Sequence, residues 1–310
     1  SLRAALDNGF DPRGVAAFPD GRVLVAGTDL ELGRARTFTL DPSVGFAPVA
    51  SWTAGTSNNE ARAVALAKDG SLVIAGVEHM DWHDDAIVWS FPADALPAIL
   101  RWEGPMPFAL LNEVANAVYI DEERILVAGS AVLFNDLFDQ SPRAFVLEYA
   151  RSHTLARWWA HADGPLQQSS VGAGVAAASH GGAVIVGHMQ LQPNTPRYLQ
   201  IVELAPTADA FEAVAHLLEG QPGFAGGVAR DPSARAVVVW TNTEHNPTTL
   251  DAVALNLEQA KVSWQAGYEH TQSELVEAAA VAVDPYGFVY FLGTVTYDGG
   301  IQVVVGKRRP

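Results

Sequence analysis

One stretch of sequence recurs six times along the 310 residues of this chain, and this repetition constrains the fold more than any other feature. Residues 14–27 read GVAAFPDGRVLVAG and residues 63–76 read AVALAKDGSLVIAG, and later copies begin at residues 117, 174, 227 and 280. The second residue of each copy is valine, and 49 to 57 residues separate successive copies. Such a period predicts a chain built from repeated copies of one supersecondary unit.

Each copy predicts two apolar strands joined by a tight turn. Asp20-Gly21 and Asp69-Gly70 mark two of these turns, because Asp-Gly supplies the positive φ that a hairpin requires. A third strand is expected after a loop, for example at residues 86–89 and 201–204. A fourth short strand ends in tryptophan, which we expect to pack in the core or at a sheet edge: Trp52, Trp102, Trp158 or Trp159, and Trp264. Four antiparallel strands per unit form the blade of a propeller.

The sequence therefore predicts an all-β fold, a single six-bladed β-propeller domain over residues 1–310. The expected blades are 13–52, 62–102, 116–159, 173–217, 226–264, and 279–310 together with 1–6. The last unit ends after its third strand at residues 301–305, so we expect residues 2–6 to supply the missing fourth strand. Pairing the first strand with the last would close the ring and remove its exposed edges.

The pattern resembles bacterial β-propeller repeat families, whose blades read roughly "avavd-dG-vyvaG … dafv … W", and the resemblance covers essentially the whole chain. It implies blade packing and no particular activity. Because such repeats occur mostly in secreted or surface proteins of bacteria, it also implies a secreted, periplasmic or cell-surface location, although no signal peptide is recognisable. The fifth copy departs from the pattern, with Trp240 at the strand-end glycine and Arg230 at an apolar position.

Charge and composition exclude several classes of partner and chemistry. The net charge of −16 argues against nucleic acid and anionic membranes, which bind cationic surfaces. The chain has no cysteine, which excludes disulfides, thiolate nucleophiles and cysteine-ligated metals. No apolar run reaches the ~18 residues needed to span a membrane, so we expect no membrane insertion.

The expected loops are of unequal length, and this predicts which face carries the function. The turns within the first and third hairpins are short, whereas the second-to-third-strand loops and the connections between blades are longer. The longer segments are 77–85, 103–116, 130–143, 160–173 and 265–279. Binding residues concentrate on loops held by a rigid scaffold, so we predict the site on the face that carries these segments, called here the long-loop face.

An acidic group is expected on this face. The residue three positions before each repeat is acidic in three adjacent blades, at Asp11, Glu60 and Glu277, and apolar in the others. Together with Asn116, these carboxylates form a candidate Ca²⁺ site, because calcium takes six to eight oxygen ligands. The alternative is that Arg13 and Arg62 pair with the acids in a structural network.

Histidines and aromatic residues provide the remaining candidates on the long-loop face. The segment 78–85 (EHMDWHDD) combines imidazoles, carboxylates and a tryptophan, which suits ligand contact, a transition metal or a merely solvated loop. Aromatic rings beside polar groups are typical of carbohydrate and protein recognition, although each could instead anchor its own loop. The predicted ligand-binding residues are His79, Asp81, Trp82, His83, Phe108, Phe224, Tyr268, Arg13 and Arg62.

Two functions remain open from the sequence. The first is a non-catalytic propeller that presents its long-loop face to a glycan, a peptide, a protein or a small-molecule ligand. The second is a calcium-dependent hydrolase or lactonase with its site at the channel mouth, where His161, His188 or His270 would act as a base. No GxSxG, P-loop or Rossmann motif is present to name a reaction, and calcium is the one cofactor that the pattern suggests.

Overall fold

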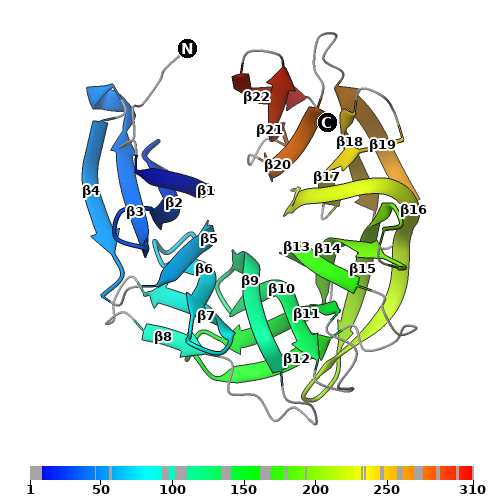
Figure 1. Cartoon of the computed structure of the whole chain (residues 1–310), viewed down its shortest axis with the longest axis horizontal. Coiled ribbons are helices and arrows are strands. Elements are labelled where there is room, and N and C mark those ends of the chain that lie inside the picture. Colours follow the sequence, from blue (N-terminus) through cyan, green and yellow to red (C-terminus); the bar gives the residue numbers. More distant parts are fainter. Residues whose placement is uncertain are drawn as a thin grey trace. The chain divides into compact units, whose positions relative to one another are not determined.

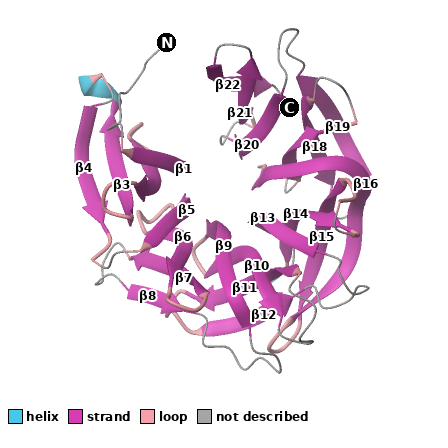
Figure 2. Ribbon diagram, in the orientation of Figure 1, coloured by secondary structure: helices cyan, strands magenta, loops and turns pink. Residues whose placement is uncertain are grey.

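The computed structural model is an all-β chain whose described strands are drawn in Figures 1 and 2. It describes all residues except 1–8, 46, 56–57, 93–97, 102–109, 134–140, 161–168, 179–180, 193, 232, 234, 245–247, 257–260, 269–274, 284–286, 298–299 and 309–310. The chain divides into two compact units, Ser1–Leu137 with Leu147–Ala156 and Phe138–Val146 with Arg157–Pro310. No helix in the described part is long and apolar enough to cross a membrane.

Three antiparallel four-stranded sheets follow one another along the first half of the chain, each in sequence order. The first holds β1 (Phe10–Ala17), β2 (Val23–Asp29), β3 (Arg34–Asp41) and β4 (Ala47–Thr53), with the 3-10 turn Pro42–Val44 before β4. The second holds β5 (Asn59–Leu66), β6 (Leu72–His79), β7 (Asp84–Phe91) and β8 (Ala98–Arg101). The third holds β9 (Leu110–Ile120), β10 (Arg124–Leu133), β11 (Pro142–Ala150) and β12 (Leu155–Ala160), and the boundary between the two units passes through it.

The rest of the chain forms a seven-stranded and a three-stranded sheet. The larger sheet holds β13 (Ser169–Ala177), β14 (Ala183–Gln190), β15 (Arg197–Pro206), β16 (Phe211–Arg230), β17 (Ala236–Asn242), β18 (Thr249–Asn256) and β19 (Lys261–Tyr268). The smaller sheet holds β20 (Leu275–Val283), β21 (Val289–Tyr297) and β22 (Gly300–Arg308). The described strands thus form a β-propeller arrangement of successive antiparallel sheets.

The expectation of six separate four-stranded blades is not met. Strand β16 is continuous over 20 residues, and its first part pairs with β15 while residues 223–230 pair with β17. The expected blades end at residue 217 and begin again at residue 226, but the strand runs through this interval, with Gly223 at a φ of 151° where it changes partner. The predicted closing strand, residues 2–6, lies outside the described residues, so closure of a ring stays a prediction.

The predicted hairpin turns are confirmed. Gly21 and Gly70 have φ angles of 90° and 87°, the left-handed region that glycine tolerates best. Asp20 accepts a hydrogen bond from the backbone N–H of Arg22, and Asp69 accepts one from that of Ser71. The side chain of each aspartate thus closes the turn that its glycine permits.

The apolar residues of the repeat form the cores of the sheets, as the pattern predicts. Ile74, in the second strand of its sheet, is fully buried. The fourth-strand tryptophan Trp52 packs edge-on against Trp89 and Phe91, with ring centroids 5.7 and 5.1 Å apart. Its role is therefore structural, as expected.

A β-bulge interrupts the first strand of every repeat at the same place, two residues before the repeat valine. The registers with the second strand each skip one residue there. The bulge residues are Arg13, Arg62, Asn116, Ala173, Gly226 and Ala279. A bulge leaves its extra residue outside the ladder, so the side chain at this position varies without breaking the strand pairing.

The bulge explains the last glycine of the repeat, which lies inside the second strand at Gly76 and Gly187. A Cβ on Gly76 would overlap the carbonyl oxygen of Glu60, and one on Gly187 would overlap that of Val171. In both cases this carbonyl belongs to the residue two positions before the bulge. The fifth repeat has Trp240 instead and places glycine on the facing strand, where a Cβ on Gly223 would overlap the Thr241 carbonyl oxygen.

Candidate functional site

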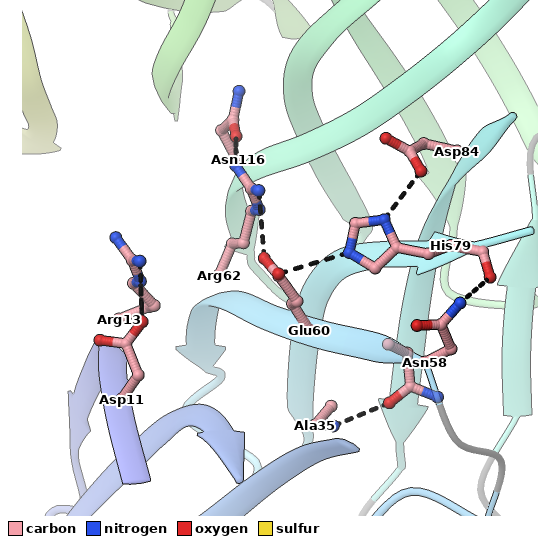
Figure 3. A network of polar contacts seen from close by, with 10 residues as sticks. Asp11, Arg13, Ala35, Asn58, Glu60, Arg62, His79, Asp84 and Asn116 are labelled. Carbon is pink, nitrogen blue, oxygen red and sulfur yellow. Dashed lines mark hydrogen bonds and ion pairs between the residues drawn. The ribbon is translucent and has the colours of Figure 1, made fainter. Parts of the chain in front are cut away.

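Polar side chains of the first unit gather at one end of the second sheet. Antiparallel pairing places Glu60, near the start of β5, opposite Val77, and places His79, at the end of β6, opposite Asp84, the first residue of β7. Residues Glu60, Arg62, His79, Asp84 and Asn116 are called here the polar cluster, and Figure 3 shows them with their contacts. Their strands come from the second and third sheets.

His79 lies between two carboxylates. Its Nδ1 is 2.8 Å from Oδ1 of Asp84, and its Nε2 is 3.3 Å from Oε1 of Glu60 (Figure 3). Partial burial lowers the pKa of His79, but the hydrogen bonds to Asp84 and Glu60 outweigh this effect and the pKa is raised. The protonated ring, which donates from both nitrogens, is thus the form that the cluster stabilises.

Arg62 connects the second sheet to the third. Its Nη2 donates to Oε2 of Glu60 at 3.1 Å, and its Nη1 donates to Oδ1 of Asn116 on β9 at 3.2 Å. Arg62 and Asn116 are the bulge residues of neighbouring first strands, so the bulges themselves bring these side chains together. In β1 the bulge residue likewise pairs with the acid two positions before it: Nη2 of Arg13 lies 2.7 Å from Oδ2 of Asp11.

Two asparagines with positive φ anchor the strand ends around the cluster. Asn58 has a φ of 70° and exchanges two hydrogen bonds with His79: its Nδ2 donates to the His79 carbonyl, and its own carbonyl accepts from the His79 N–H. Asn112, with a φ of 55°, accepts from the backbone N–H of Asp84. Asparagine is one of the few residues that tolerates this conformation, which suits it to these positions.

The turn between β6 and β7 is much shorter than the predicted loop. Residues 77–79 and 84–85 belong to the ladder, and only residues 80–83 lie between the strands. Trp82 is 92% exposed in this turn, while Nε2 of His83 lies 3.0 Å from Oδ1 of Asp85. Asp81 is also exposed. An exposed indole thus stands between the two strand ends that carry His79 and Asp84.

Glu113 on β9 is a titratable residue that the sequence interpretation missed. Burial, and then the charge of Asp85, raise its pKa to about 7. Burial and Glu113 in turn raise the pKa of Tyr149 above its ordinary value. With a pKa of about 7 the Glu113 carboxyl is partly protonated at neutral pH, as a general acid must be. The sequence gives no hint of this, because Glu113 follows Asn112 in segment 103–116, which was expected to be one of the long loops.

Asp84 was also missed as an individual contact. Its segment was recognised as acidic, but the choice of Asp84 as the partner of His79 depends on the hairpin register. If the loop had been predicted as residues 80–83, the hairpin register would have paired residue 79 with residue 84 and so identified Asp84 as the partner of His79.

In the second unit, His188 on β14 is half-buried against Phe224. The two rings meet edge-on with centroids 5.8 Å apart, and the guanidinium of Arg197 lies 5.1 Å from the Phe224 centroid. Burial, and then the charge of Arg197, lower the pKa of His188 to about 4, so its ring is neutral near pH 7. Phe224, expected as a ligand contact, packs here against protein side chains.

The structure brings only some of the predicted residues together. Asp11 and Glu60 pair with Arg13 and Arg62, as in the alternative of a structural network, and Glu277 lies on β20 in the second unit. No group of three or more His, Asp or Glu side chains among the described residues is arranged to hold a metal ion. His161, His270, Phe108 and the side chain of Tyr268 lie outside the described part. The calcium site therefore stays a prediction.

No protein-family model matches the chain, and no curated protein matches it. Solved structures do match nearly its whole length. The α-L-arabinofuranosidase Arb93A from Fusarium graminearum is 10% identical, with a TM-score of 0.60 over 98% of this chain and 94% of that chain. A PL25 ulvan lyase is 9% identical, with a TM-score of 0.62 over 99% of this chain and 82% of that chain. Kuenenia stuttgartiensis hydrazine synthase is 11% identical, with a TM-score of 0.60 over 94% and 78%.

The chain has a β-propeller fold. The predicted resemblance to propeller repeats is thereby confirmed for the fold, and the similarity of 9–11% identity shows nothing beyond it. In this propeller, the first strand of each repeat carries both the bulge and the acidic or apolar residue two positions before it. In β5 these two positions are Glu60 and Arg62, the charged pair of the polar cluster.

Proposed function

We propose that the protein is a non-catalytic binding propeller that presents the polar cluster and Trp82 to a glycan, a peptide, a protein or a small-molecule ligand. The observation that carries this proposal is that both ring nitrogens of His79 already have carboxylate partners. A general base needs a nitrogen lone pair to accept a proton. Here both ring nitrogens face carboxylates and the raised pKa favours the protonated ring, which supports a fixed hydrogen-bonding surface.

Trp82 supports the same proposal. Its exposed fraction of 92% is the highest among the large hydrophobic side chains of the described residues. Tryptophan is enriched among the residues that dominate binding energies, since its ring offers a large apolar face together with an N–H donor. The short turn that holds Trp82 between β6 and β7 limits the entropy lost when a ligand covers the ring.

The alternative is a hydrolase or lactonase, and Glu113 is the observation that favours it. A carboxyl group with a pKa of about 7 could deliver a proton at neutral pH. Several similar structures have enzyme names, including the arabinofuranosidase and the ulvan lyase. Calcium, if bound, would polarise a substrate carbonyl. In that case His188, neutral near pH 7, is the one predicted base within the described residues.

Two further expectations belong to this proposal. We propose that β16 completes one blade and opens the next, which gives six blades with residues 2–6 in the last. We also propose a secreted, periplasmic or cell-surface location, on the resemblance of the repeats alone.

The test compares two single changes in one turn. Panels of glycans, esters and lactones are first screened for binding and for turnover. For a binder, Trp82→Ala should weaken the affinity by about 2 kcal/mol, as loss of an aromatic hot spot does, and His83→Ala should have little effect. Val44→Ala, at a 56% exposed valine in the 3-10 turn before β4, is the control for loss of an exposed apolar side chain.

Turnover of an ester or lactone that Glu113→Gln lowers by about 10²–10⁴ would overturn the binding proposal in favour of the enzyme. Loss of that turnover after chelation of calcium, with recovery when calcium is added back, would show that the ion takes part. A confirmed ligand that binds Trp82→Ala as tightly as the parent would exclude the β6–β7 turn from the binding surface.

A further inference from the structure

The bulge positions of β1, β5 and β9 form a row of hydrogen-bonding groups across three neighbouring strands. A Cβ on Gly14 of β1 would meet the backbone of Ala63 on β5 at 3.0 Å, so these two strands lie against each other. Arg62 of β5 reaches Asn116 of β9 at 3.2 Å. The same register position thus presents Arg13, Arg62 and Asn116 in sequence along the row.

Each arginine in the row has an acceptor beside it. Asp11 and Glu60 each lie two residues before the bulge on the same strand and pair with Arg13 and Arg62. These side chains remain partly open to solvent, with exposed fractions of 59% for Arg13, 37% for Asp11 and Arg62, and 36% for Glu60. A carboxylate has about four acceptor sites and a guanidinium has five donors, so both have capacity beyond these pairs.

The charges of this row cancel, although the whole chain carries a net charge of −16. Asp11 and Glu60 are matched by Arg13 and Arg62, and the carboxylate of Asp84 lies against the His79 ring, whose pKa is raised by its hydrogen bonds to Asp84 and Glu60. A ligand with a strong charge of either sign would gain little net Coulomb energy there and would have to compete with an existing partner. A ligand that both donates and accepts hydrogen bonds can instead use donors and acceptors that are already fixed in place.

We infer that this row, together with Trp82 on the turn between His79 and Asp84, binds a neutral oligosaccharide. Vicinal hydroxyl groups donate to carboxylates and accept from guanidinium and amide groups, which is the alternation that the row offers. Trp82 provides the flat apolar surface on which the C–H face of a sugar ring packs, and its turn connects His79 to Asp84. This inference rests on the proposed binding function and specifies its ligand.

The experiment offers the intact protein three classes of probe in 50 and 500 mM NaCl. They are neutral oligosaccharides from glucan, xylan, arabinan and galactan, oligogalacturonates, and a lysine-rich peptide, with affinities measured by calorimetry. We expect a neutral oligosaccharide to bind. Its affinity should change less than twofold between the two salt concentrations, because an uncharged ligand makes no ion pair that salt could screen.

Arg62→Gln should weaken that binding about tenfold or more, since a hydrogen bond to a charged group is lost. Arg13→Gln, at the same position of the more exposed pair, keeps the test available if Arg62→Gln does not fold. The control is Arg22→Gln, because Arg22 makes the same pair two residues after an aspartate, but in the β1–β2 turn.

The outcomes separate the inference from the proposed function. Preferential, salt-sensitive binding of oligogalacturonates or of the peptide would overturn the inference and leave a binding propeller standing. Neutral oligosaccharide binding that neither Arg62→Gln nor Arg13→Gln weakens would place the ligand elsewhere and would also overturn it. If no probe of any class binds, the proposed binding function fails as well.

Discussion

At the scale of single residues, the contact between Gly76 and the Glu60 carbonyl links the repeat to its bulge. The strand-end glycine reads in the sequence as a marker of the repeat, and the structure gives its cause. The carbonyl of the residue two before the bulge occupies the space where a side chain would begin. The same contact occurs at Gly27 and Gly187, so one steric rule applies in different sheets.

Gly76→Ala should therefore lower the free energy of unfolding by about 1–3 kcal/mol or more, because the new methyl group must displace backbone. Urea denaturation measures the effect. Gly55→Ala is the matched control, since a Cβ on Gly55 would meet no atom within 4 Å and its backbone lies outside the strained region. Equal stability of the two variants would contradict the steric explanation of the repeat glycine.

Glu113 gives a prediction about pH. Its pKa is raised to about 7 from 4.5, so the folded state prefers the protonated carboxyl. The stability that this preference contributes is complete below about pH 4.5 and is lost as the pH rises through about 7. Glu113→Gln fixes the neutral form, so it should melt like the parent near pH 4.5 and at a higher temperature than the parent at pH 8.

Glu122→Gln, at an exposed glutamate before the β10 strand, is the control for this comparison. A melting difference between Glu113→Gln and the parent that stays constant from pH 4.5 to 8 would show that Glu113 does not titrate in this range.

At the scale of strands and sheets, a buried side-chain acceptor joins neighbouring sheets. Oδ1 of Asn59, at the start of β5, accepts from the backbone N–H of Ala35 on β3 at 2.7 Å. At an exposed position, Oδ1 of Asn112 on β9 also accepts from the backbone N–H of Asp84 on β7. In both cases a backbone N–H on the third strand of one sheet donates to an asparagine side chain on the first strand of the next sheet.

Asn59→Ala should leave the N–H of Ala35 buried without its acceptor and cost about 1–3 kcal/mol of unfolding free energy. Asn59 is only 1% exposed, so water has little access to replace the lost bond. Ser51→Ala, at an exposed position of β4, should change the stability by less than about 0.5 kcal/mol. Hydrogen exchange at Ala35 measures the effect locally, and unchanged protection there would contradict it.

The sequence predicts strands and turns better than it predicts where strands end. Apolar alternation and Asp-Gly pairs located the first hairpins, as the φ values of Gly21 and Gly70 confirm. The loop expected at 77–85 is mostly ladder, because polar residues such as His79 and Asp84 pair through backbone groups that the hydrophobic pattern does not indicate. The raised pKa of Glu113 depends on burial by other strands, which no local pattern reveals.

At the scale of the whole molecule, the propeller fold follows from the repeat, but the number of separate sheets does not. Six copies predicted six four-stranded blades, whereas β16 runs without a break between two sets of partners. The interval between the expected blades 173–217 and 226–264 lies within this strand. The expected pairing of residues 2–6 with β22 stays a prediction.

Deletion of residues 1–6 tests this closure. If these residues complete the last sheet, the truncated chain should lose several kcal/mol of unfolding free energy, because β22 would become an open edge. Guanidinium denaturation with a circular-dichroism readout measures the loss. A truncated chain with the same denaturation midpoint as the parent would show that the ring, if closed, is closed by other residues.

The bulges also bear on how such a molecule diversifies. Because each bulge residue stands outside the ladder, its side chain can be exchanged without loss of a backbone hydrogen bond, except at Gly226, where a Cβ would lie 2.7 Å from the backbone of Ala278. The six positions now read Arg, Arg, Asn, Ala, Gly and Ala around an otherwise uniform framework. A library restricted to the five bulge codons other than Gly226 should therefore yield new ligand preferences from chains that still fold.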